Sequence, residues 1–466
     1  MIPLALSEIA ELTGGTAPPG AAGAVAAGPV VIDSRAAGPG ALFVALRGDR
    51  VDGHDFAAAA VAAGAAGVLA ARPLDGVPAV VVDDVVAALG RLARGVLERL
   101  PDATVVGVTG SAGKTSTKDL IAQVLEHHGP TVAPKGSFNN EIGHPLTVLR
   151  ADEGTRHLVL EMGARGIGHI AYLCEVAPPG VGVVLNVGSA HIGEFGGREV
   201  IAKAKGELVE ALTPTGVAVL NADDPLVRAM TSRTSARVVT FGRAADATVR
   251  AEDETLDAQG RPRFTLVTPE AAVPVSLGLR GSHAVGNALA AAAVAREAGM
   301  APAAVAEALS AARPMSRWRM EVTERPDGVV VVNDAYNANP ESMSAALDTV
   351  AHMARAAGGR AFAALGEMGE LGARSVAEHE KIGQHVARDG FAGLVAVGAA
   401  TAPMLDGAGR QGSWTGECVQ VDDVGAAVTA LNERLRPRDV VLVKGSRVTG
   451  MERVAEGLLA AGGSSR

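Results

Sequence analysis

The stretch Val105-Val106-Gly107-Val108-Thr109-Gly110-Ser111-Ala112-Gly113-Lys114-Thr115-Ser116 passes from an apolar run into a glycine-rich turn that ends in Gly-Lys-Thr. In such a turn, successive backbone N–H groups and the start of the following helix face an anion. Lys114 supplies a positive charge for the distal phosphates, and the hydroxyl of Thr115 suits Mg²⁺. The stretch therefore predicts a strand, a phosphate-binding loop and a helix. Binding of a nucleoside triphosphate is the leading hypothesis.

The loop departs at one position from the strict phosphate-loop pattern, which has glycine where this chain has Val108. A glycine-rich turn formed by chance is the alternative interpretation. The flanking sequence favours the functional one. A β-prone run precedes the loop, and the segment Lys118-Asp119-Leu120-Ile121-Ala122-Gln123-Val124-Leu125 carries apolar residues at helical spacing.

Length and composition limit the class of protein. The chain has 466 residues, of which 48% are hydrophobic and 20% charged, which indicates a folded protein of about three domains. No segment offers the ~20 consecutive apolar residues of a membrane span, and the N-terminus lacks the basic head of a secretory signal. We therefore expect a cytoplasmic protein without a membrane span.

Charge and cysteine content bear on the partners. The net charge of -9 is not gathered in long runs of like charge, so we expect small-molecule substrates and no binding of nucleic acid. We also expect a monomer, although the sequence does not determine the oligomeric state. The two cysteines, Cys174 and Cys418, lie far apart in the sequence. We expect them to be buried free thiols that form neither a disulfide nor a metal site.

The order of apolar runs and breaks predicts an α/β fold in three parts, with boundaries at 1–100, 101–312 and 313–466. In the central part, apolar runs such as His157-Leu158-Val159-Leu160-Glu161 and Val181-Gly182-Val183-Val184-Leu185-Asn186 alternate with helical segments, which is typical of a mostly parallel sheet. The third part is another βαβ succession, with strands expected at 329–332, 361–365, 394–397 and 440–443.

Polar residues follow the central strands, at the edge where open α/β sheets bind ligands. Glu161 ends one apolar run, and its carboxylate is a candidate ligand for Mg²⁺. A solvated strand-end glutamate is the alternative. His191 lies just beyond the next run, where a surface or capping histidine is the simpler interpretation.

Lys203 and Lys205 lie on a predicted amphipathic helix, where solvent-facing charge is the simplest interpretation. An ammonium group beside Mg²⁺ would be repelled. A lysine near the metal must therefore meet phosphate, or lose its charge through a modification such as carbamylation.

Several separated motifs together resemble one family, the Mur ligases, which are ATP-dependent amide-forming enzymes of bacterial cell-wall synthesis. The resemblance spans almost the whole chain. Besides the phosphate loop, it rests on Asp33-Ser34-Arg35, Gly40-Ala41-Leu42-Phe43-Val44-Ala45-Leu46, Asn139-Asn140-Glu141-Ile142-Gly143-His144-Pro145-Leu146-Thr147, Asn333-Asp334-Ala335-Tyr336-Asn337-Ala338-Asn339-Pro340-Glu341-Ser342-Met343, Leu365-Gly366-Glu367-Met368-Gly369-Glu370-Leu371-Gly372 and Lys444-Gly445-Ser446-Arg447.

The resemblance implies a three-domain architecture. An N-terminal domain binds a UDP-sugar, a central P-loop ATPase-like domain binds ATP on a mostly parallel sheet, and a C-terminal doubly wound α/β domain closes on the nucleotide and binds the incoming amine. The motifs are most similar to those of the member that joins D-alanyl-D-alanine to the terminal carboxylate of UDP-N-acetylmuramoyl-tripeptide. That reaction proceeds through an acyl phosphate and gives the pentapeptide precursor of peptidoglycan. It implies ATP, Mg²⁺ and a lysine that is a candidate for carbamylation.

The resemblance also assigns site residues. The ATP-binding residues it implies are Gly110, Ser111, Ala112, Gly113, Lys114, Thr115, Ser116, Asn287, Arg319 and Asp334. The implied ligands of Mg²⁺ are Thr115, Glu161, His191 and Lys205, and Lys205 is preferred to Lys203 as the modified lysine. The candidate catalytic residues are Lys114, His191 and Lys205. The implied substrate contacts are Ser34, Arg35, Asn139, Asn140, Asn337 and Asn339, and residues 366–372 are expected to contribute to the dipeptide pocket.

Simpler local alternatives exist for some of these residues. Asp334 suits a turn or helix cap, Ser34-Arg35 a turn with a surface ion pair, and Asn139-Asn140 a turn with unusual backbone angles.

Rival functions also remain. One is the ligase of the same family that adds a diamino acid, whose Asp-Asn-Pro-Arg motif the chain lacks. Folylpolyglutamate synthetase shares the ATPase core but has no counterpart of residues 333–343. A nonenzymatic P-loop nucleotide switch would explain the phosphate loop and little else.

Overall fold

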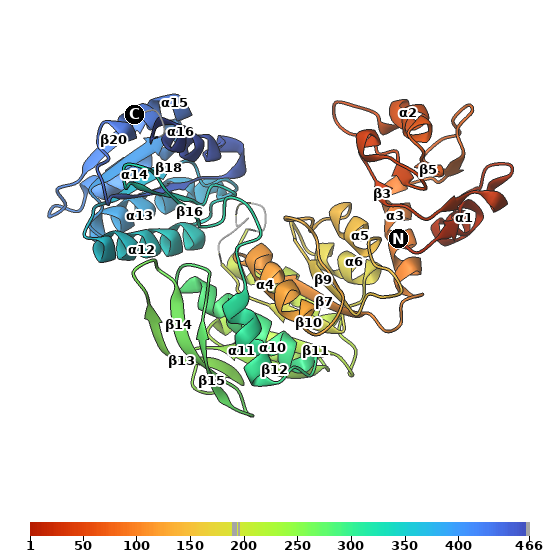
Figure 1. Ribbon diagram of the computed structural model, residues 1–466, viewed down its shortest axis with the longest axis horizontal. Coiled ribbons are helices and arrows are strands. Elements are labelled where there is room, and N and C mark those ends of the chain that lie inside the picture. Colours follow the sequence, from red (N-terminus) through yellow and green to blue (C-terminus); the bar gives the residue numbers. More distant parts are fainter. Residues whose placement is uncertain (189–192, 194–195, 463–466) are drawn as a thin grey trace.

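The computed structural model describes residues 1–188, 193 and 196–462. Three α/β units follow one another along the chain, each built on its own sheet. Figure 1 shows the N-terminal and C-terminal units on opposite sides of the central one. The predicted three-domain α/β architecture is therefore confirmed, whereas the boundaries at residues 100 and 312 remain predictions.

The N-terminal unit contains a small parallel sheet in the order β3-β4-β5-β6. Its strands are β3 (Val30–Val31), β4 (Leu42–Val44), β5 (Gly67–Ala70) and β6 (Ala79–Val81), and β1 (Leu4–Ala5) pairs separately with β2 (Val25–Ala26). The helices are α1 (Leu6–Thr13), α2 (Ala57–Ala62) and α3 (Val85–Leu97). One face of α3 is apolar and packs in a core with α1 and the first strands of this unit.

The central unit is built on a nine-stranded sheet in the order β15-β14-β13-β12-β11-β10-β7-β9-β8. Seven of these strands run parallel: β7 (Thr104–Thr109), β8 (Thr131–Val132), β9 (His157–Glu161), β10 (Val181–Val184), β11 (Val217–Asn221), β12 (Arg237–Gly242) and β13 (Val249–Leu256). An antiparallel extension adds β14 (Pro262–Val267) and β15 (Ala272–Ser276). The helices are α4 (Lys114–Glu126), α5 (Gly143–Val148), α6 (His169–Val176), α8 (Arg198–Glu210), α9 (Pro225–Arg228), α10 (His283–Glu297) and α11 (Pro302–Ala311).

Strand order creates a binding crevice in the central sheet. The chain leaves β7 toward β9 and β8 on one side and returns to form β10 on the other. Helices consequently cover both faces, and separate apolar cores lie on either side of the sheet. The carboxyl ends of β7 and β10 meet at this switch point, which is where open α/β sheets bind ligands.

The C-terminal unit repeats the doubly wound plan on a sheet in the order β16-β17-β21-β18-β19-β20. Its strands are β16 (Glu321–Glu324), β17 (Val330–Asn333), β18 (Ala361–Leu365), β19 (Gly393–Val397), β20 (Glu417–Val421) and β21 (Val440–Lys444), and only β16 is antiparallel to its neighbour. The helices are α12 (Pro340–Ala357), α13 (Ser375–Arg388), α14 (Ala402–Gly409), α15 (Val424–Asn432) and α16 (Glu452–Gly462). Again, apolar cores lie on both faces.

The two cysteines differ in environment. Cys174 is buried in α6, as expected, but Cys418 is exposed, so that part of the prediction is wrong. Cys418 lies on β20, which is the edge strand of the C-terminal sheet and is covered on one side only by β19.

In the part of the chain that the structure describes, none of the helices combines the length and the apolar character that crossing a bilayer requires.

Candidate active site

The phosphate loop joins β7 to α4. Gly113 is the N-cap of α4 and has a left-handed backbone with a φ of 81°. A Cβ at this position would lie 2.8 Å from Oδ1 of Asn287, so both the backbone and the space require glycine. Lys114 begins the helix, and its Nζ donates to the carbonyl of Gly110 at 2.8 Å. The loop therefore leads directly into the positive end of α4, which can face an anion.

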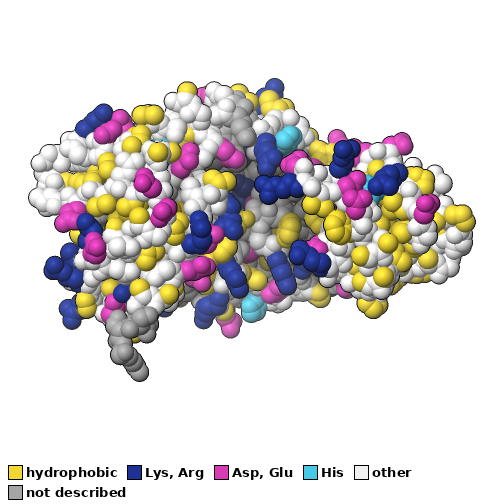
Figure 2. Space-filling model, turned by 90° about the horizontal axis from the view of Figure 1, so that it is seen from above, with side chains coloured by type: hydrophobic (Ala, Val, Ile, Leu, Met, Phe, Trp, Pro, Cys, Tyr) yellow, Lys and Arg dark blue, Asp and Glu magenta, His cyan; other side chains and the backbone are white. Residues whose placement is uncertain are grey.

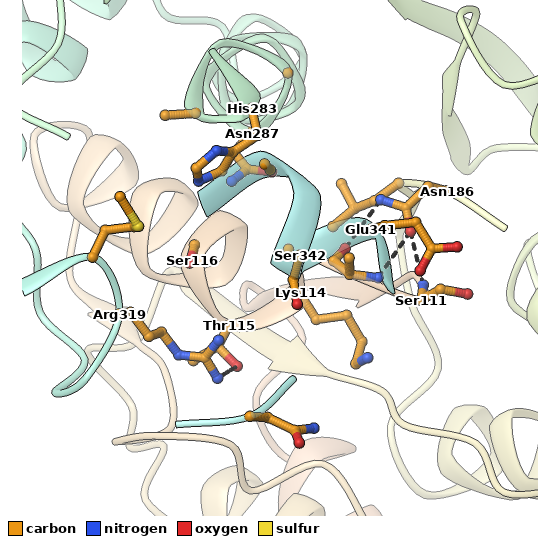
Figure 3. Close-up of a pocket in the computed structure, with 18 of the residues that line it drawn as sticks. Ser111, Lys114, Thr115, Ser116, Asn186, His283, Asn287, Arg319, Glu341 and Ser342 are labelled. Carbon is orange, nitrogen blue, oxygen red and sulfur yellow. Dashed lines mark hydrogen bonds between the residues drawn. The ribbon is translucent and has the colours of Figure 1, made fainter. Parts of the chain in front are cut away.

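Asn186 fixes the shape of this loop from the neighbouring strand. Its Oδ1 accepts from the backbone N–H groups of Ser111 and Ala112, both at 2.9 Å, and its Nδ2 donates to the carbonyl of Ala112 at 3.1 Å. Figure 3 shows Asn186 beside Ser111 at one end of the cavity. Asn186 follows β10, and β10 lies next to β7 at the switch point of the sheet. The strand order therefore brings this side chain to the phosphate loop.

Glu161 is the centre of a buried polar cluster behind the loop. It ends β9 and is 1% exposed. Its Oε2 accepts from the hydroxyl of Thr115 at 2.8 Å, and its Oε1 accepts from Ser137 Oγ at 2.8 Å and from Asn139 Nδ2 at 2.7 Å. A carboxylate and a hydroxyl oxygen are thus held side by side at the phosphate loop, and these are hard ligands of the kind that Mg²⁺ prefers.

Two lysines, Lys114 in the cleft wall and the buried Lys205, give the site its electrostatic character. Burial lowers the pKa of Lys114, and the carboxylate of Glu161 partly offsets this effect. Lys205 lies on α8 and is 4% exposed, while Lys203 on the same helix is exposed. Burial, together with the charge of Lys114, lowers the pKa of Lys205 well below the usual 10.5. The solvent-facing alternative therefore does not hold for Lys205.

The C-terminal unit closes over the phosphate loop through Arg319. Its Nη2 donates to Oγ1 of Thr115 at 2.8 Å, and its guanidinium stacks on the ring of Tyr336 at 4.1 Å from the centroid. Asn339 also reaches across, donating to the carbonyl of Ser111 at 3.5 Å while its side chain caps α12. Asp334, which follows β17, is paired with Lys444 at 2.6 Å.

A cleft of about 570 Å³ lies between the central and C-terminal units. Figure 3 shows His283 and Asn287 entering it from α10, with Arg319 beside Thr115. Figure 2 shows Lys and Arg side chains gathered around a hollow in the middle of the upper face. Of the sequence-predicted residues, those that line the cleft are Ser111, Ala112, Gly113, Lys114, Thr115, Ser116, Asn139, Glu161, Asn287, Arg319, Asp334, Asn337 and Asn339.

Other predicted residues do not line this cleft. Ser34 and Arg35 lie in a short 3₁₀ helix of the N-terminal unit, where Arg35 forms an exposed ion pair with Asp33 at 2.7 Å. Asn140 accepts from the backbone of Gly143 at 2.9 Å and so shapes the turn before α5. Lys205 is buried on α8 and is not among the residues that line the cleft. The prediction for His191 falls outside the described residues.

Sequence reasoning gave no role to three residues that the site uses. Asn186 ends an apolar run, and this position predicts that it lies at the ligand-binding edge of the sheet, although not that it contacts the phosphate loop. Lys444 also ends an apolar run, and the same signal could have found it. Ser137 stands two residues before the Asn139-Asn140 motif, with no periodic pattern around it.

Family models match most of the chain. The Mur ligase family catalytic domain matches residues 29–96, the Mur ligase middle domain residues 108–295, and the Mur ligase glutamate ligase domain residues 318–447. The three matches follow one another in the same order as the three sheets of the structure.

Individual relatives are similar over almost their full length. The UDP-N-acetylmuramoyl-tripeptide--D-alanyl-D-alanine ligase of Mycobacterium tuberculosis is 50% identical, covering 99% of this chain and 98% of that protein. The protein of the same name from Escherichia coli is 36% identical over 92% and 93%.

Solved structures agree with these relatives. A crystal structure of MurF from Acinetobacter baumannii matches with a TM-score of 0.87 at 30% identity, covering 98% of this chain and 99% of that one. The MurF ligase of Thermotoga maritima in complex with ADP matches with a TM-score of 0.82 at 31% identity, covering 94% and 98%.

Proposed function

This chain belongs to the Mur ligase family, and we propose that it is the ATP-dependent ligase that joins D-alanyl-D-alanine to the terminal carboxylate of UDP-N-acetylmuramoyl-tripeptide. The product is the pentapeptide precursor of peptidoglycan. One observation carries the proposal from the geometry: Arg319 of the C-terminal unit touches Thr115 of the phosphate loop, so the two units form a single nucleotide site. The relatives that bear this activity in their names match nearly the whole chain.

ATP binds in the cleft with its phosphates on residues 110–116. The loop N–H groups and Lys114 face the phosphates, Asn287 lies toward the adenine, and Arg319 and Asp334 close over the nucleotide. This placement is supported by the shared lining of the cleft and by the positive end of α4.

Mg²⁺ fits the oxygen pair formed by Thr115 and Glu161, because both atoms are hard ligands and already lie 2.8 Å apart. These two residues would hold the ion, with His191 as a further candidate ligand. When bound, the ion neutralises charge on the phosphates.

The reaction begins with the substrate carboxylate attacking the γ-phosphorus of ATP, and ADP leaves. Both partners are anionic, so the cationic groups of Lys114 and Arg319 lower the repulsion between them. The amine of D-alanyl-D-alanine then attacks the carbonyl carbon of the acyl phosphate, loses a proton and expels inorganic phosphate. Closure of the C-terminal unit positions the reactants and keeps water from the acyl phosphate.

Lys205 is the proposed site of carbamylation. Its amine is buried, and its lowered pKa favours the neutral form that adds CO₂. The addition forms an N–C bond and releases a proton, which leaves a carbamate anion. The negative charge would suit the neighbourhood of Lys114, whose positive charge already acts on this amine.

The remaining substrate contacts are also proposals. Ser34 and Arg35 serve the UDP end in the N-terminal unit, while Asn139, Asn140, Asn337 and Asn339 help to place the peptide. We also propose that the enzyme acts in the cytoplasm, where its nucleotide substrates are made. We propose that it is a monomer.

A coupled phosphate-release assay tests the function. We expect phosphate only when ATP, the UDP-linked tripeptide and D-alanyl-D-alanine are all present. Release with a diamino acid in place of the dipeptide would favour the other ligase of the family. Release from ATP alone at the same rate would favour a nucleotide switch, and either result would overturn the proposal.

A further inference from the structure

We propose that the segment Lys444-Gly445-Ser446-Arg447 is a positioning element that fixes two substrate loops in one arrangement. The nucleotide loop is residues 334–339, which follow β17, and the dipeptide loop is residues 366–372, which follow β18. The segment begins at the end of β21, which lies between β17 and β18 in the sheet. The inference rests on the proposed function, in which Asp334 of the nucleotide loop closes over ATP, and on the Mur ligase resemblance, which implies that residues 366–372 contribute to the dipeptide pocket.

Lys444 anchors the nucleotide loop. Its Nζ donates to Oδ2 of Asp334 at 2.6 Å and to the carbonyl of Asn337 at 2.9 Å, and its side chain is 3% exposed. The other carboxylate oxygen of Asp334 accepts from the backbone N–H of Met320 at 3.0 Å. The buried amine of Lys444 therefore holds the nucleotide loop directly. Through Asp334 it also holds Met320, which follows Arg319 in the chain.

Ser446 anchors the dipeptide loop. Its backbone N–H donates to the carbonyl of Glu367 at 2.8 Å, and its Oγ accepts from the N–H of Gly369 at 2.6 Å. On its other side, the loop is held by His379, whose Nε2 accepts from the N–H of Met368 at 3.0 Å. The loop backbone is thus held by Ser446, which belongs to the same segment as Lys444, and by His379 of α13.

Gly445 lets the two anchors lie close together. A Cβ at this position would be 2.7 Å from both Oγ1 of Thr449 and Cγ of Met451, and 3.1 Å from Cα of Gly366. A side chain there would displace Thr449 and Met451 and press on the dipeptide loop at Gly366.

Arg447 extends the same element to the linker between the units. Its guanidinium lies 4.4 Å from the ring centroid of Trp318, a geometry of attraction between a cation and an aromatic face. Trp318 has a left-handed backbone with a φ of 58° and directly precedes Arg319, so its conformation depends on such support.

The segment contacts the two loops and not the reacting atoms. Substitutions in it should therefore change the KM of the substrate that each loop binds, so the KM for ATP and the KM for D-alanyl-D-alanine are measured separately. In the full-length enzyme, Ser446→Ala removes the acceptor for Gly369. We expect the KM for D-alanyl-D-alanine to rise about fivefold while the KM for ATP changes less than about twofold. Lys444→Arg keeps the charge but cannot place the same bonds from one nitrogen, and we expect the KM for ATP to rise about fivefold.

Thr401→Ala is the matched control. Its buried hydroxyl donates to the carbonyl of Gly398 at 2.6 Å in the same unit, outside both loops, so both Michaelis constants should stay unchanged. Unchanged constants in Ser446→Ala and Lys444→Arg would overturn the proposal. So would an equal rise of both constants in all three variants, because that pattern indicates general destabilisation.

A binding measurement separates this inference from the proposed function. If the wild-type enzyme released no phosphate in response to the dipeptide, the proposed function would fail. Calorimetric binding of ADP to Lys444→Arg would still test the anchor. We expect about fivefold weaker binding than in the wild type, and equal affinity would contradict the role of Lys444.

Discussion

Asn186→Ala should weaken nucleotide binding strongly, although Asn186 is not part of the phosphate loop. Its side chain forms three hydrogen bonds to the backbone of Ser111 and Ala112. At a net ~1 kcal/mol each, and allowing for water that replaces part of them at the cleft wall, their loss costs about 1.5 to 3 kcal/mol. Nucleotide binding must then restore the order of the loop, so up to this amount is lost from the binding free energy, which corresponds to about a 10- to 150-fold loss of ATP affinity.

Isothermal titration calorimetry with ADP and with a non-hydrolysable ATP analogue measures this loss. Asn221→Ala is the matched control, since Asn221 also lines the cleft but donates to the carbonyl of Leu185, at 2.7 Å, instead of the loop. We expect its affinity to change less than about threefold. If a folded Asn186→Ala variant bound nucleotide within a factor of about two of the wild type, the loop would not depend on this side chain and the reasoning would be refuted.

Three further predictions concern pH, nucleotide closure and thiols. Burial lowers the pKa of His144 from 6.5 to about 4. Between pH 6.5 and pH 4, the unfolded chain therefore binds a proton at this histidine and the folded protein does not. Lowering the pH from 7 to 5 should therefore cost about 2 kcal/mol of folding free energy, measured by urea unfolding, and a His144→Gln variant that lost as much would contradict this. Arg319→Lys keeps the charge but loses the planar stacking on Tyr336, so kcat/KM for ATP should fall about tenfold; an unchanged value would exclude this contact from catalysis. A thiol reagent should label Cys418 in the native protein but not Cys174, whose pKa burial raises to about 12; mass mapping of the label on Cys174 before unfolding would refute this.

Buried parallel strands were the most predictable part of the fold. The runs at 157–161 and 361–365 match β9 and β18 residue for residue. A strand covered on both faces is apolar throughout, so its sequence marks its limits. The phosphate loop was predictable for a related reason, because its glycines meet a local backbone requirement that does not depend on distant contacts.

Residues whose role depends on the order of strands were not predictable in this way. Asn186 shapes the phosphate loop only because β10 lies next to β7, and Lys444 reaches Asp334 only because β21 is inserted beside β17. The burial of Lys205 likewise depends on what packs against α8. The exposure of Cys418 follows from the edge position of β20, which no local pattern reveals.

The most direct measurement compares peptide-bond synthesis by the wild type and by Lys114→Met, with ATP, the UDP-linked tripeptide and D-alanyl-D-alanine all supplied. Lys114 sits at the start of α4 and is the cation of the phosphate loop. The rate of pentapeptide formation should fall about 100-fold or more, while the variant remains folded by circular dichroism. Synthesis at the wild-type rate would contradict transfer of a phosphoryl group at this loop.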